Sequence, residues 1–310
     1  MKSTSSKPLF WGYLLTLCGG FFWAVGGICG QLLFQKNEMT SNWLVPVRLT
    51  ISGLILLAAA LITRRDITSV WRQKRDRLEI LLFGLLGSAL CQYSYYTSIQ
   101  YSNAAFATIL AYTSPVLILA YTAFRSRRAP RLYELLCVVL VVLGAVVCST
   151  HLNFQMLSVS PVALFWGVVC SVGMTIYTLE PRRLLQHHDL LSVVGWGMVI
   201  GGIALIPLCR PWEETVQVDT HLYIMLAAVI LLGTVFSFCM YQAGVSIVGG
   251  LAGSVLSSVE PVGSVILSVL FLNIQFSPLD FLGFAMILIT IPIIAYYQGK
   301  EQKETVNTSS

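Results

Sequence analysis

The sequence predicts an all-α integral membrane protein with ten transmembrane helices, arranged as two inverted five-helix repeats with both termini in the cytoplasm. Three observations predict this class. The 310-residue chain is 56% hydrophobic and only 11% charged, its apolar runs are long enough to span a bilayer, and its two halves resemble each other. A soluble domain does not need so much apolar surface, so the composition argues against a soluble enzyme.

The apolar runs are counted against the thickness of the bilayer. A helix rises ~1.5 Å per residue and the hydrocarbon layer is ~30 Å thick, so a span needs about 17 to 25 apolar residues. The runs are 9–34, 43–62, 80–96, 104–124, 132–148, 161–177, 191–208, 222–243, 250–272 and 278–297, of which the third, fifth and sixth are short. The first run contains no small-residue cleavage site, so it predicts a membrane helix and not a signal peptide.

The positions of lysine and arginine predict the orientation, because positively charged loops stay in the cytoplasm. With the N-terminus inside, sixteen of the nineteen basic residues are cytoplasmic. Lys36 and Arg210 face outward, and Arg48 lies within a span. The net charge of +5 suits the anionic inner leaflet, and the absence of an aromatic-interleaved basic stripe argues against nucleic acid. We therefore expect a multi-pass protein of the cell (inner) membrane, with the lipid bilayer as its environment.

An internal repeat appears at a displacement of 146 residues. The segment YYTSIQYSNAAFATILAYTSPV, which starts at Tyr95, aligns with YQAGVSIVGGLAGSVLSSVEPV, which starts at Tyr241. We expect one repeat over residues 1–150, a second over 159–298, and a disordered cytoplasmic tail over 299–310. An odd number of helices in each repeat inverts the second copy, as in many secondary transporters, and predicts a site between the halves near the midplane.

These segments resemble the EamA branch of the drug/metabolite transporter superfamily, and the resemblance covers about residues 9–297. It rests on the FFW and LFW openings of the two repeats, on PVRLTISGLILLAAAL, on YTSIQYSNAAFATILAYTSPV and on VLSSVEPVGSVILSVLFL. It implies a carrier that exports small metabolites such as amino acids, drugs or sugars. Family members typically carry a glutamate motif after the fourth and ninth helices, where this chain has FRSRRAP and FLNIQFSP without a carboxylate.

Glu260 is the first candidate for the substrate or coupling site. It lies midway along the ninth run, where an ionised carboxylate costs ~3 kcal/mol, and such a charge usually faces a cavity. Pro261 follows it and interrupts the backbone hydrogen bonding of the helix. Glu260 could take a coupling proton or a substrate amine, and the alternative is a structural hydrogen bond to a neighbouring helix.

Arg48 is the second candidate, because an arginine within a span can bind a carboxylate through two hydrogen bonds. Alternatively, its side chain reaches out to the lipid headgroups. Pro115 matches Pro261 in the repeat, and a symmetric pair of proline kinks suits a gating carrier, although such kinks also occur in static bundles.

Polar and aromatic residues of the first, third and fourth runs complete the predicted cavity. Gln92, Tyr95, Tyr112 and Ser114 are favoured as lining residues, together with Trp23 of the glycine-rich first run. Apolar walls with a few polar groups suit a small metabolite. The neighbouring tyrosines, Tyr93 and Tyr96, are not expected to line the same cavity.

The sequence carries no GxSxG, HExxH or phosphate-loop motif, so no catalytic residue, metal or cofactor is expected. His187-His188-Asp189 is interpreted as a solvated loop and not as a metal site. The predicted function is secondary transport by alternating access around a central cavity, with a small-molecule substrate and, optionally, a proton. A polytopic membrane enzyme or a lipid-handling protein is the alternative.

Overall fold

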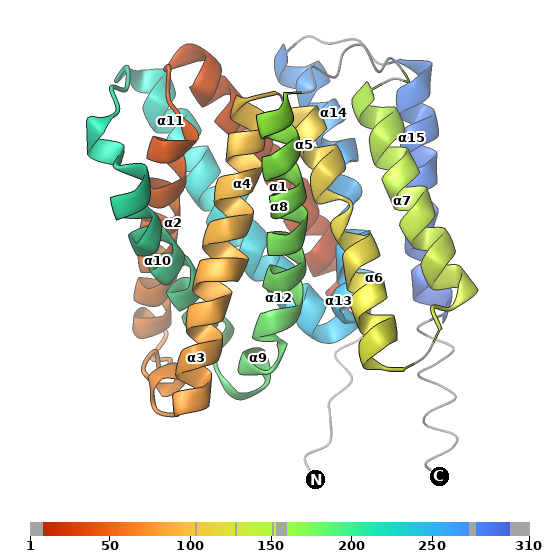
Figure 1. The fold of residues 1–310 in the computed structure, drawn as a ribbon, viewed down its shortest axis with the longest axis horizontal. Coiled ribbons are helices and arrows are strands. Elements are labelled where there is room, and N and C mark those ends of the chain that lie inside the picture. Colours follow the sequence, from red (N-terminus) through yellow and green to blue (C-terminus); the bar gives the residue numbers. More distant parts are fainter. Residues whose placement is uncertain are drawn as a thin grey trace.

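The computed structural model describes residues 9–102, 104–127, 129–150, 152, 160–272 and 277–297, and every regular element in these ranges is a helix. Figure 1 shows the helices packed side by side in one bundle, with most axes running between the same two ends. A helix pairs its backbone N–H and C=O groups within its own segment, which allows it to cross a bilayer. The prediction of an all-helical membrane protein is therefore confirmed. The predicted tail, 299–310, lies outside the described residues.

The helices follow one another with short connections. The first half contains α1 (Leu9–Lys36), α2 (Ser41–Ile62), α3 (Lys74–Leu82), α4 (Leu90–Gln100), α5 (Ala104–Ala111), α6 (Ser114–Arg125) and α7 (Leu132–Thr150). The second half contains α8 (Pro161–Leu179), α9 (Leu184–His187), α10 (Leu190–Cys209), α11 (Thr220–Ile230), α12 (Ser237–Val248), α13 (Gly250–Leu256), α14 (Val259–Leu272) and α15 (Pro278–Leu288), and 290–297 is again helical. Two π-helical segments, Phe83–Ala89 and Leu231–Phe236, join α3 to α4 and α11 to α12.

Among the described residues, eight helices are long and apolar enough to cross a membrane, and two shorter apolar helices cover Leu132–Val147 and Phe281–Tyr297. The prediction that the third and sixth runs are short is wrong, because these helices cover Lys74–Gln100 and Pro161–His187, with 27 residues each. The apolar runs stop at charged side chains. The helices continue beyond them because their backbone hydrogen bonds do not depend on side-chain polarity.

Two helices are interrupted at matching places. Tyr112 and Thr113 separate α5 from α6, and Ser257 and Ser258 separate α13 from α14. Each break is followed by a proline in the first turn of the next helix, Pro115 in α6 and Pro261 in α14. A proline in the first turn has no N–H, but that N–H would lack a helical partner anyway, so proline favours a new helix start. The sequence predicted kinks at these prolines, and in the structure a two-residue turn separates the helical segments at each place.

Helix α1 lies against α11, α12 and α14, and its glycines set the spacing. A Cβ atom on Gly26 would lie only 2.9 Å from the Cα atom of Gly233, in the π-helical segment before α12. A Cβ atom on Gly20 would collide with the backbone carbonyl of Ser257, at the break before α14. Glycine therefore allows the backbone of α1 to approach both of these irregular segments.

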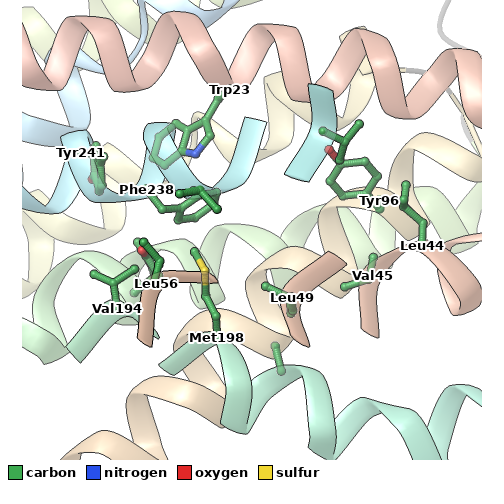
Figure 2. Packing of buried hydrophobic residues seen from close by; sticks show 14 of the residues in the cluster. Trp23, Leu44, Val45, Leu49, Leu56, Tyr96, Val194, Met198, Phe238 and Tyr241 are labelled. Carbon is green, nitrogen blue, oxygen red and sulfur yellow. The ribbon is translucent and has the colours of Figure 1, made fainter. Parts of the chain in front are cut away.

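The interior next to α1 is largely aromatic. Figure 2 shows Trp23 of α1 beside Phe238 and Tyr241 of α12, with ring centroids 5.1 and 4.6 Å from the indole. Tyr96 of α4 lies in the same hydrophobic cluster. Aromatic pairs at such distances add to the stability that comes from burial of their area. They form one wall of the space described below.

Most basic side chains lie at one end of the bundle. The connections α2 to α3, α6 to α7 and α8 to α10 lie at the same end, at the bottom of Figure 1. Leu9 and Ile294, near the two described ends of the chain, pack into a single apolar cluster. The described arginines of these connections are Arg64, Arg65, Arg72, Arg127, Arg131, Arg182 and Arg183. This distribution agrees with the predicted orientation, and the cytoplasmic location of this end stays a prediction.

Candidate functional site

A cavity lies inside the bundle and collects most of the side chains singled out from the sequence. Its walls come from elements far apart in the chain, including α1, α2, α4, α8, α12 and both helix breaks. Seven of the nine predicted site residues line it: Trp23, Arg48, Gln92, Tyr95, Tyr112, Ser114 and Glu260. Apolar and aromatic walls with a few polar groups are typical of a site for a small molecule.

Glu260 is held by two tyrosines from the first half of the chain. The Tyr95 hydroxyl donates to Oε1 at 3.0 Å and the Tyr112 hydroxyl lies 2.9 Å from Oε2. Tyr112 also lies 2.8 Å from the backbone carbonyl of Ser257, so its single proton is shared between two acceptors. The carboxylate is 6% exposed, and no described basic residue forms an ion pair with it. Hydrogen bonds from two hydroxyls favour the ionised form, whereas burial favours the protonated form.

Arg48 lies in the same cavity and is also unpaired. Its Nη2 donates to Oε1 of Gln92, and its Cζ lies 4.2 Å from the ring centroid of Tyr96. The residue is 1% exposed, which excludes the alternative that its side chain reaches the headgroups. Within the described part of the chain, Nε and Nη1 have no hydrogen-bond partner. The guanidinium is therefore fixed by one amide and one aromatic ring, and no carboxylate of the described residues neutralises it.

The aromatic wall of the cavity also includes an N–H group without a described hydrogen-bond acceptor. The Trp23 Nε1 atom is buried and has no hydrogen-bond partner among the described residues. Tyr95 and Tyr96 are adjacent in α4, with ring centroids 5.4 Å apart. Tyr95 contacts Glu260 and Tyr96 contacts Arg48, so this tyrosine pair lies between the two charged groups of the cavity.

Comparison with known proteins gives the family. The model of the EamA-like transporter family matches the chain twice, over residues 10–150 and 161–296. The chain belongs to the EamA-like transporter family. It is 33% identical to an uncharacterized inner membrane transporter, YicL, of Salmonella typhimurium, over 92% of this chain and 95% of that protein. The EamA-family chain is thus a multi-pass membrane transporter.

Two further comparisons concern a named exporter and a fold. The pseudopaline exporter CntI of Pseudomonas aeruginosa is 31% identical over 163 residues, which are 51% of this chain and 55% of that protein. A crystal structure of another protein superposes with a TM-score of 0.76 at 19% identity, and covers 91% of this chain and 94% of that one. At this identity the second comparison concerns the fold alone.

Two predicted site residues of this EamA-family chain do not line the cavity. Pro115 and Pro261 are buried in the first turns of α6 and α14, and they place Ser114 and Glu260 at the cavity wall. Conversely, the expectation that Tyr96 does not line the cavity is wrong, whereas Tyr93 is not among the lining residues. Tyr96 follows Gln92 by four residues and so lies on the same helical face, which is the signal that could have identified it.

The interpretation of His187-His188-Asp189 as a solvated loop is wrong for His188. Its side chain is 8% exposed, its Nε2 lies 2.9 Å from Oδ2 of Asp76, and its Nδ1 lies 2.9 Å from Oγ of Ser69. Arg183 bridges Asp76 and Glu79 in the same place, with its Nε 2.7 Å from Oε2 of Glu79. We call Asp76, Glu79, Arg183 and His188 the end cluster. No group of three metal-ligand side chains occurs among the described residues.

Proposed function

We propose that this EamA-family chain is a secondary carrier that exports small metabolites such as amino acids or drugs across the cell inner membrane. The observation that carries the proposal is the central cavity with Arg48 and Glu260 in its walls, both buried and neither paired with an opposite charge in the described residues. Burying a charge within a membrane protein costs free energy, and such a charge usually marks a transport pathway. A static bundle would gain nothing from keeping both.

The proposed architecture is ten spans in two inverted repeats of five, over about 1–150 and 159–298. The starts of two helices support this architecture. Helix α5 begins at Ala104 and α13 at Gly250, which differ by the displacement of 146 residues found in the sequence. The breaks that follow them, and the π-helical segments that precede them, lie at nearly the same displacement. The two shorter apolar helices would be the fifth and tenth spans.

The proposed mechanism is alternating access, in which the halves rock and open the cavity to one side at a time. The broken helices suit this motion, because the residues of each break form turns and the proline that follows has no N–H to donate to the preceding turn. Tyr112 belongs to the first break and contacts Ser257 and Glu260 at the second, so any movement of one half against the other changes the surroundings of the carboxylate. Glu260 would take a coupling proton or the amine of the substrate.

The proposed direction is export. It is supported by the relative named as a pseudopaline exporter. A polytopic membrane enzyme or lipid-handling protein is the second candidate. The relatives named as transporters favour the carrier.

The test is flux in proteoliposomes. Labelled amino acids, amines, carboxylic acids and sugars are offered with and without an imposed pH gradient. We expect saturable flux of at least one class, stimulated by unlabelled substrate on the opposite side, as alternating access requires. Flux that rises linearly with concentration would indicate a channel. No flux of any class would favour the enzyme or the lipid-handling protein.

A further inference from the structure

The guanidinium of Arg48 is the least satisfied charge of the described interior. An arginine has five N–H donors and is always charged at physiological pH. Here Gln92 accepts one hydrogen bond at Nη2, while Nε and Nη1 have no partner in the described structure. The Tyr96 ring covers the guanidinium at 4.2 Å and holds its plane. The side chain is thus oriented by its neighbours but its charge is not neutralised by them.

A buried charge with few hydrogen-bond partners lowers the stability of the folded protein. Burying a charge without a partner costs several kcal/mol, and the cost is usually met by a carboxylate nearby. Arg183 of the end cluster, for comparison, has two carboxylates within ion-pair distance. Arg48 has none among the described residues, although it lines the central cavity. The missing partner is therefore expected to arrive with the ligand.

We infer that Arg48 is the anchor for a carboxylate, and that the substrates of this carrier bear one. The inference rests on the proposed function, because it concerns the same cavity. A planar carboxylate can accept two hydrogen bonds from a guanidinium, and the charge-assisted bonds are about twice as strong as neutral ones. The Nε1–H of Trp23, also without a described partner in the lining, is a further donor for an oxygen of the ligand.

The charged residues that line the cavity also restrict the charge of the ligand. Arg48 is the only lysine or arginine among the described lining residues, and Glu260 is the only carboxylate. A doubly charged anion such as a phosphate monoester would meet one cation and one anion, so a singly charged carboxylate fits better. The rest of the ligand would contact Trp23, Met174 and Phe238, which are apolar surfaces. The substrate is thus a monocarboxylate with an apolar body, with or without an amine for Glu260.

The experiment uses purified full-length protein in proteoliposomes and a library of carboxylic acids, each paired with its primary amide. Phenylalanine and phenylalaninamide are one pair, and 3-phenylpropionate and 3-phenylpropionamide are another. Each pair keeps the shape and removes the carboxylate. Wild type is compared with Arg48→Gln and Arg48→Lys, and with Arg210→Gln as a matched control, since Arg210 is an exposed arginine outside the cavity.

We expect wild type and Arg210→Gln to transport at least one acid about tenfold faster than its amide, and Arg48→Gln to lose this preference. Arg48→Lys keeps the charge without the planar donors and is expected to be intermediate. Equal flux of acids and amides in wild type, or a preference that survives in Arg48→Gln, overturns the inference and leaves the proposed carrier standing. No flux from any member of this library overturns the inference, and it overturns the proposed function only if the amines and sugars of the wider panel are not transported either.

A second measurement uses only the wild-type protein, so it does not require that any variant folds. Thermal unfolding of the wild-type protein in detergent is followed with each acid and each amide, because a ligand that binds the folded state raises the midpoint. Acids of the transported pairs are expected to raise it and their amides are not. An equal shift by both members of every pair contradicts the assignment of Arg48, whatever the behaviour of Arg48→Gln.

Discussion

The bundle contains two groups of buried charges, and they differ in how completely their members are paired. In the end cluster, Asp76 contacts Arg183 and His188, and Glu79 contacts Arg183, so each charged group has an opposite partner. The side chains of Arg183 and Glu79 are nevertheless partly exposed, at 29% and 15%. In the central cavity, Arg48 and Glu260 are more deeply buried, and they are held by an amide, aromatic rings and hydroxyls.

The difference indicates two separate roles. A fully paired cluster lowers the energy of one arrangement of the helices, and it gains nothing from a ligand. An unpaired pair of opposite charges in a cavity destabilises the empty protein and is satisfied by a molecule that supplies the missing partner. Substitutions in the end cluster should therefore change stability more than transport, and substitutions in the cavity should do the opposite.

The largest expected effect is that of Glu260→Gln on transport. The amide keeps the size of the side chain but can neither ionise nor take a proton, so we expect flux to fall at least tenfold. Unfolding in detergent should shift little or toward higher stability, because replacing an unpaired buried charge by a neutral group is often stabilising. Glu213→Gln, the same substitution at an exposed carboxylate outside the cavity, is the control and should transport within about twofold of wild type. Full transport by Glu260→Gln at every pH would remove Glu260 from the mechanism.

The next effect is that of Asp76→Asn on stability. The substitution leaves Arg183 with only Glu79 and leaves His188 without its carboxylate partner, so the thermal midpoint should fall by about 5 °C. Transport per folded molecule should stay within about twofold of wild type. A variant with unchanged stability and strongly reduced flux would show that the end cluster belongs to the transport cycle.

A smaller effect is expected when one hydrogen bond to Glu260 is removed. Tyr95→Phe and Tyr112→Phe each delete one hydroxyl and keep the ring, and a hydrogen bond to a charged group contributes about 1.5 kcal/mol, or roughly tenfold. Tyr112→Phe should have the greater effect on flux, because its hydroxyl also contacts Ser257 across the two breaks. The measurement is initial flux at saturating and subsaturating substrate. If the two substitutions reduce flux equally, and a double variant shows the sum of their effects, the contact of Tyr112 with Ser257 has no role in transport.

The smallest effect is expected for Asp66→Asn, at the same end of the bundle as the end cluster but exposed. Asp66 accepts hydrogen bonds from the backbone N–H and the hydroxyl of Thr68 and pairs with Arg72 at 2.7 Å. The hydrogen bonds from Thr68, and then the charge of Arg72, hold the pKa of this carboxyl below its usual value.

The pH dependence of Asp66 follows from the sign of that shift. Because the pKa is lower in the folded state, the stabilisation is present above the unfolded pKa of ~3.9 and is lost as the pH falls through the folded value. Wild type and Asp66→Asn should therefore differ slightly at pH 7 and converge once the pH lies below the lowered, folded-state pKa, in unfolding followed by circular dichroism. A difference as large as that of Asp76→Asn would contradict the contrast between exposed and buried pairs.

Several features of the fold and the site follow from the sequence alone. Composition and the length of the apolar runs determine an all-helical membrane protein, because only a membrane interior makes so much apolar surface favourable. The cost of a charge in hydrocarbon makes Arg48 and Glu260 candidates for a cavity before any contact is known, although the alternatives of a headgroup contact and a structural hydrogen bond stay open at that stage. The positions of Pro115 and Pro261 mark the helix breaks. The count of ten spans and the inverted repeat stay predictions.

Only the tertiary structure decides which of these residues meet. Helical periodicity tells which side chains share a face, but not which helix lies opposite that face. The sequence therefore could not show that Tyr95 and Tyr112 both reach Glu260, or that Tyr96 covers Arg48. For the same reason it left His188 in a solvated loop, since its partner Asp76 lies 112 residues away in the chain. These contacts depend on how the helices pack in three dimensions, and no local pattern records that.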